Sequence, residues 1–126
     1  MKVIIAGSRD IFPGPATIRE AIRRSGFEVT EVVCGCSKGV DTAGEAWAMD
    51  HRIPVALFAA DWDQYGAAAG PRRNNEMAEY ADALIAIWDY ESRGTRNMIE
   101  AMRQRNKPSH VIGYCKKSRK LIEAPQ

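Results

Sequence analysis

Short apolar segments alternate with amphipathic segments along the chain, and this alternation constrains the fold more than any other feature. Apolar runs rich in β-branched residues occur at 3–6, 29–33, 55–58, 83–88 and 111–114. Their length and mostly non-alternating apolar character are typical of strands buried on both faces of a sheet. Because the connections are short, such strands require a parallel sheet with helices on both faces. The sequence therefore predicts a three-layer α/β/α fold with a mostly parallel sheet of about five strands.

Segments with apolar residues at helical spacing separate these strands. The first carries Ile18, Ala21 and Ile22 and ends at Gly26, which can adopt the left-handed conformation that terminates a helix. Further helices are expected at 42–50, 70–81 and 92–105. Residues 121–122 either add a short edge strand or lie along the surface.

The length and charge of the chain fit one globular domain without a nucleic-acid partner. Its 126 residues suffice for a single core, with 45% hydrophobic and 27% charged residues. We expect the domain to span 1–115 and a basic tail to span 116–126. The net charge of +2 is too small to indicate nucleic-acid binding.

The remaining composition favours a cytoplasmic protein without a metal. The apolar runs are too short to span a bilayer and no signal peptide is evident, so no membrane partner is expected. Cys34, Cys36 and Cys115 are an odd number of cysteines and are expected to be reduced. His51 and His110 are isolated, so no metal site is predicted.

The stretch at 70–74, Gly-Pro-Arg-Arg-Asn, combines two guanidinium groups and a carboxamide with an expected helix start. Amides at a helix N-terminus and nearby arginines are well suited to bind phosphate. We therefore expect this stretch to face an anionic ligand. The alternative for Arg73, and for Arg9, is a solvated side chain or an ion pair with a neighbour such as Asp10 or Glu76.

The loops that follow the predicted strands carry glycine and polar residues, whereas the turns at the opposite ends are ordinary charged turns. Ligands of open parallel sheets bind at the carboxyl ends of the strands. This asymmetry indicates a binding pocket. The ligand-binding candidates are Gly7, Ser8, Arg9, Gly35, Ser37, Lys38, Gly39, Asp41, Trp62, Gly70, Pro71, Arg72, Arg73, Asn74, Ser92, Gly94 and Thr95.

Two of these candidates have alternative roles. Asp41 either accepts hydrogen bonds from ribose hydroxyls, or a helix N-cap is formed there by Asp41 or Thr42. Trp62 either stacks on a nucleobase or packs on its own loop.

The motifs at 7–9, 35–41, 69–74 and 92–95, taken in this order, resemble the SLOG superfamily, which is named for the Smf/DprA proteins and the LOG enzymes. The small YspA/YpsA-related proteins of bacteria and phages are most similar, and the resemblance covers residue 1 to about 114. It implies a Rossmann-like fold and a nucleotide pocket at the strand ends.

The resemblance also bears on catalysis. LOG enzymes cleave nucleoside monophosphates, and Arg73 occupies the place of an arginine that precedes a methionine by four residues in their motif. Their glutamate after the Gly-Thr turn has no equivalent, because Arg96, Asn97 and Met98 follow Thr95. Arg73, Glu100 and Asp41 are the catalytic candidates.

We therefore expect a sensor or sequestering protein for a nucleotide or a nucleotide-derived molecule, including NAD and ADP-ribose derivatives. No separate cofactor is expected. The alternatives are a LOG-like hydrolase of N-glycosidic bonds and a DprA-like single-stranded DNA binder. Self-association is left open, with Trp47 and Met98 to Met102 assigned either to an apolar contact face or to the core.

Overall fold

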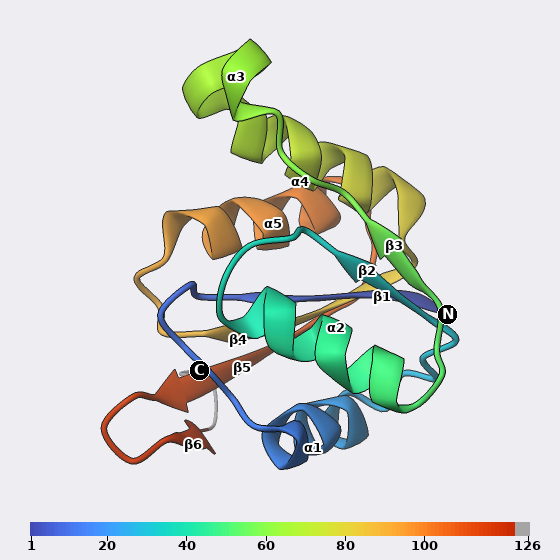
Figure 1. Ribbon diagram of the computed structural model, residues 1–126, viewed down its shortest axis with the longest axis vertical. Helices are drawn as coiled ribbons and strands as arrows, with labels where there is room; N and C mark the ends of the chain where they lie inside the picture. The colour runs from blue at the N-terminus through green and yellow to red at the C-terminus, as the bar shows by residue number, and fades with distance from the viewer. Residues whose placement is uncertain (123–126) are drawn as a thin grey trace.

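Six strands form one sheet in the order β3-β2-β1-β4-β5-β6 in the computed structural model, which describes residues 1–122 (Figure 1). All neighbours are parallel except β5 and β6, which form an antiparallel hairpin. The strands are β1 (Lys2–Gly7), β2 (Glu31–Cys34), β3 (Val55–Leu57), β4 (Ala83–Trp88), β5 (Ser109–Cys115) and β6 (Lys120–Ile122). The predicted α/β class and mostly parallel sheet are confirmed.

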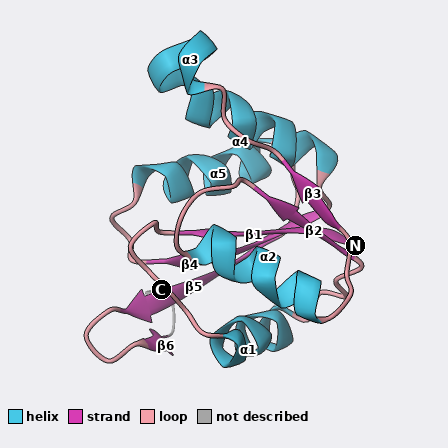
Figure 2. Cartoon of the chain, in the orientation of Figure 1, coloured by secondary structure: helices cyan, strands magenta, loops and turns pink. Residues whose placement is uncertain are grey.

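The helices cover both faces of this sheet (Figure 2). They are α1 (Pro15–Ser25), α2 (Val40–Asp50), α3 (Trp62–Tyr65), α4 (Ala69–Tyr80) and α5 (Arg93–Gln104), with a 3₁₀ turn at Gly66–Ala68. Helices α1 and α2 pack on one face, and α4 and α5 pack on the other. The short α3 extends from the start of α4, away from the strands.

Alternate residues of the central strands supply the two halves of the core. In β1, Val3 and Ile5 face α1 and α2, while Ile4 and Ala6 face α4 and α5. This two-residue period explains why the strand is apolar throughout, since both of its faces are buried. Trp47, Met98 and Met102 are buried in these clusters, so the core accounts for the side chains that were open to an interface role.

The chain reverses its winding direction between β1 and β4. Strand β2 lies on one side of β1 and β4 lies on the other, so the loops that follow β1 and β4 diverge. A crevice opens at such a switch point, at the carboxyl ends of the strands.

The segment expected to be a basic tail, 116–126, contains β6. Tyr114 pairs with Leu121, so the first of the two alternatives for 121–122, an edge strand, is correct. The last part of that segment, 123–126, lies outside the described residues. Within residues 1–122, no helix has the length and apolar character needed to cross a membrane.

Candidate functional site

A cavity of about 500 Å³ opens at the carboxyl edge of the sheet, at the switch point. Its walls come from the loops after β1, β2 and β4, from the start of α5 and from α3 and α4. The lining residues are Ala6, Gly7, Arg9, Ser37, Asp41, Trp62, Gly70, Pro71, Arg73, Asn74, Met77, Ser92, Arg93, Gly94, Thr95, Asn97 and Met98. Most of the predicted binding residues are thus brought together in one place.

Arg73 crosses the cavity from α4 to the loop after β2. One terminal nitrogen donates to the Gly35 carbonyl, and Nε donates to Asn74 Oδ1 at 2.9 Å. The ion pair with Glu76 considered for this arginine is not formed in the described structure. Two contacts hold the guanidinium in place, and its remaining donors are available to a ligand.

Asn74 fixes this arginine to the opposite wall. The side chain is 5% exposed, and its Nδ2 donates to Asn97 Oδ1 at 2.9 Å and to the Gly94 carbonyl at 3.3 Å. The carboxamide therefore joins α4 to the start of α5, while its oxygen orients Arg73. A buried amide with all of these partners makes the geometry of the cavity rigid.

The first turn of α5 lines the cavity through Arg93, Gly94 and Thr95. Ser92 is the N-cap, and its Oγ accepts from the Thr95 amide at 3.3 Å and from Thr95 Oγ1 at 3.1 Å. No acidic residue occupies the first turn of α5, so the positive end of the helix dipole is not neutralised by its own side chains. An anion is favourable at this position.

Asp41 is the carboxylate in the wall of the cavity. Burial raises its pKa to about 6, although hydrogen bonding to the Ser37 amide at 3.4 Å and the nearby Arg73 guanidinium act in the opposite direction. Of the two alternatives for Asp41, the helix N-cap at Asp41 or Thr42 is wrong, because α2 begins at Val40 and its N-cap is Gly39. Asp41 therefore lies within the first turn of α2, where its buried side chain lines the cavity.

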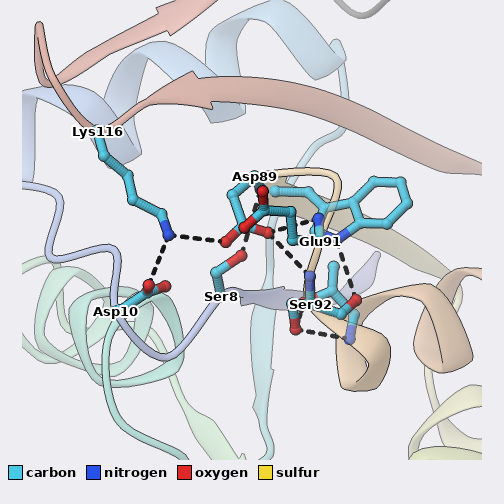
Figure 3. Close-up of polar contacts among 8 residues, drawn as sticks. Ser8, Asp10, Asp89, Glu91, Ser92 and Lys116 are labelled. Carbon is cyan, nitrogen blue, oxygen red and sulfur yellow. Dashed lines mark hydrogen bonds and ion pairs between the residues drawn. The ribbon is translucent and has the colours of Figure 1, made fainter.

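The loops after β1 and β4 are held by a polar network around Asp89 (Figure 3). Ser8 Oγ accepts from the Asp89 amide at 3.3 Å, and the Asp89 carboxylate accepts from the amides of Glu91 and Ser92 at 2.9 Å. Lys116 bridges Asp89 at 3.1 Å and Asp10 at 2.6 Å. Burial alone would raise the pKa of Asp89, but these hydrogen bonds lower it to about 2.

This network changes the interpretation of Ser8 and of Lys116. Ser8 is only 1% exposed and does not line the cavity; its hydroxyl instead connects the loop after β1 to the loop after β4. Lys116 belongs to the hairpin of β5 and β6, and it anchors that hairpin to the edge where the cavity opens.

Trp62 forms an outer wall. It is 49% exposed, its ring lies 5.9 Å from the Arg9 guanidinium, and it closes over Gly70, where an added Cβ would lie 3.3 Å from the ring. Arg72 instead stacks on Tyr65 at 3.9 Å and does not line the cavity.

The expected helix start at Gly70 is displaced. Helix α4 begins at Ala69 and continues directly from the 3₁₀ turn, where the Ala69 amide donates to the Gly66 carbonyl. The Ala69 amide at this helix start is therefore already hydrogen-bonded within the chain, and Pro71 has no amide hydrogen to donate to an anion. The start of α5 is the better anion site of the two.

Two predicted glycines serve close packing. A Cβ on Gly7 would lie 2.0 Å from the Ile87 carbonyl. Gly39 has φ 78° and would place a Cβ 2.6 Å from the carbonyls of Ser8 and Arg9, so it lets the loops after β1 and β2 approach each other.

The structure does not bring Glu100 to the cavity. Its position almost two turns into α5 places it on the exposed side, where it pairs with Arg103. Five lining residues were not among the predicted ones, namely Ala6, Met77, Arg93, Asn97 and Met98. Helical spacing from Thr95 could have found Met98, and from Asn74 it could have found Met77.

No group of three or more His, Cys, Asp or Glu side chains that could hold a metal occurs within residues 1–122. Cys34, Cys36 and Cys115 carry free thiols. Burial raises the pKa of Cys34 to about 12, so this thiol stays protonated near neutral pH.

The fold and the position of the cavity define a Rossmann-like α/β protein. DNA processing protein A (DprA) from Streptococcus pneumoniae has a similar fold, with a TM-score of 0.69 and 19% sequence identity. The match covers 87% of this chain and 49% of that one, so the chain spans about half the length of DprA.

The sequence comparisons identify the family. The sequence model of YAcAr, described as the YspA, cpYpsA-related SLOG family, matches residues 1–65. The gene 61 protein of Mycobacterium phage D29 is 31% identical over 123 residues, which cover 90% of this chain and 95% of that protein. The chain belongs to the YspA, cpYpsA-related SLOG family, as its motifs indicated.

Proposed function

We propose that the cavity binds a nucleotide or a nucleotide-derived small molecule, and that the protein acts as a sensor or a sequestering protein. One observation carries this proposal: the same cavity holds the start of α5, whose first turn contains no acidic residue, a guanidinium held by two hydrogen bonds and a buried carboxylate. Phosphate, a second anionic oxygen and a sugar hydroxyl are the natural partners of these three groups.

Each wall then has a role in recognition. The amides at the start of α5 bind a phosphate, and the free donors of Arg73 bind another of its oxygens. Asp41 accepts from a ribose hydroxyl. Trp62, half-exposed at the rim, stacks on the base, because an indole offers a large flat surface to any nucleobase.

Calorimetric titration with nucleoside monophosphates, NAD and ADP-ribose tests the proposal. Arg73→Gln should weaken binding about tenfold or more, as expected for loss of a hydrogen bond to a charged group. Arg72→Gln is the matched control, since it removes the same charge from the adjacent residue outside the cavity. The proposal fails if no ligand binds more tightly than about 1 mM, or if both variants weaken binding equally.

Hydrolysis of N-glycosidic bonds is the second candidate function, and the pKa of Asp41 favours it. A carboxyl group with a pKa of about 6 can exchange a proton near neutral pH, as a general acid or base must. Free base released from nucleoside monophosphates, measured by chromatography and abolished in Asp41→Asn, would establish catalysis. If no base is released, binding alone remains.

A further inference from the structure

A second cavity lies beside the first, over the loop that follows β2. It encloses about 450 Å³ and shares Arg9, Ser37, Trp62 and Arg73 with the first cavity. Lys38 lines only the second cavity, while the start of α5 lines only the first. The roles proposed above leave this second space without an occupant.

Cations dominate this second space. Arg9, Lys38 and Arg73 all line it, and no carboxylate from residues 1–122 does. None of the three forms an ion pair within the described part of the chain. Three cations around one concavity create a positive potential, which the single Asp41 carboxylate in the adjoining cavity offsets only in part, so an anion entering it is favourable.

The two spaces are joined but chemically different. Each has a volume within the range of about 300–1,000 Å³ that is typical of a complete ligand site. Arg73 stands at their boundary and is held there by Gly35 and Asn74. The anion site at the start of α5 and the anion site at Lys38 therefore belong to separate compartments.

We propose that the joined cavities bind a nucleotide whose phosphates sit at two separate positions of the nucleoside, as in a nucleoside 3′,5′-bisphosphate. One phosphate lies at the start of α5, and the other lies among Arg9, Lys38 and Arg73. The two phosphates of a nucleoside diphosphate share a bridging oxygen and lie side by side, so we expect them to occupy one compartment, whereas the ribose separates the phosphates of a 3′,5′-bisphosphate. This inference rests on the proposed function and specifies its ligand class.

Titration of the full chain with AMP, ADP and adenosine 3′,5′-bisphosphate, and with the guanosine counterparts, tests the inference. The bisphosphate should bind about tenfold more tightly than both AMP and ADP, as one added hydrogen-bonded charge pair predicts. ADP is the control for charge, because it also adds a phosphate to AMP. Lys38→Met should remove this gain and leave AMP binding within about twofold, and Lys38→Arg should retain it.

Lys117→Met provides a matched loss of one exposed positive charge outside both cavities, and it should change none of the affinities. The inference is overturned if ADP binds more tightly than AMP by the same factor as the bisphosphate does. It is also overturned if Lys38→Met weakens the binding of AMP and of the bisphosphate equally. If AMP binds and the bisphosphate binds no more tightly than AMP, the second phosphate site is refuted while the proposed function stands. If none of the probes binds, the proposed function is refuted as well.

Discussion

Replacing Asp41 by asparagine exchanges a buried carboxyl group for a neutral side chain of nearly the same shape. Asp41 is only 5% exposed, and burial raises its pKa from 3.8 to about 6. In the unfolded chain the group keeps its ordinary pKa, so the folded protein holds this proton more tightly. The associated stability is therefore fully present below about pH 4 and is lost as the pH rises through about 6.

The magnitude follows from the shift. A difference of about two pKa units at 1.36 kcal/mol each makes the ionised carboxylate cost about 3 kcal/mol of folding free energy above about pH 7. The asparagine side chain of the variant carries no such cost, and the attraction between the carboxylate and Arg73 is already included in the net shift. We therefore expect Asp41→Asn to be more stable than the natural protein by about 3 kcal/mol near pH 8, and expect most of that advantage to vanish near pH 4.5.

Urea unfolding at these two pH values measures the difference. Glu79→Gln, an exposed charge change on α4, is the control: because it retains Asp41, the difference between its stability and that of the natural protein should change little between the two pH values. The reasoning is refuted if the stability gap between Asp41→Asn and the natural protein does not widen as the pH rises. That result would mean that Arg73 and the Ser37 amide compensate the carboxylate fully.

Three further substitutions test the scaffold of the site. Gly7→Ala places a methyl group 2.0 Å from a carbonyl of β4 and should cost about 3 kcal/mol in urea unfolding, whereas Gly14→Ala, which meets no atom within 4 Å, should cost little. Asn74→Ala should cost about 1–3 kcal/mol and also weaken nucleotide binding in calorimetry, since it frees the neighbouring guanidinium. Lys116→Met should raise the pKa of Asp89 in an NMR titration and move acid unfolding to higher pH, because a lowered pKa contributes stability that is lost as the pH falls; an unchanged pKa would contradict the network of Figure 3.

The fold was predictable because burial leaves a direct trace in the sequence. A strand buried on both faces, such as β4, must be apolar at every position, and a helix packed on one face must repeat its apolar residues at helical spacing. Helix starts were less predictable. The N-cap of α2 is Gly39, which has φ 78° and no side chain, so no capping side chain indicates this helix start in the sequence.

The site was predictable at the level of loops and less so at the level of side chains. Parallel strands bring their following loops to one edge, so Arg9, Asp41, Arg73 and Thr95 meet. Which way each side chain turns depends on tertiary contacts that no local pattern encodes. Arg72 and Arg73 are neighbours of the same type, yet one stacks on Tyr65 and the other enters the cavity.

The polar residues of this edge divide into those whose side chains are engaged within the protein and those that form no ion pair among the described residues. Ser8 and Asn74 are buried, and their side chains are engaged in hydrogen bonds that hold the loops. Arg9 and Lys38 are exposed on a concave surface and have no ion pair in the described structure. A fixed frame around cations that form no ion pair limits how far these charges must rearrange when an anion binds. The gain in affinity from a second phosphate should accordingly depend most on the exposed cations, and stability most on the buried amide and hydroxyl.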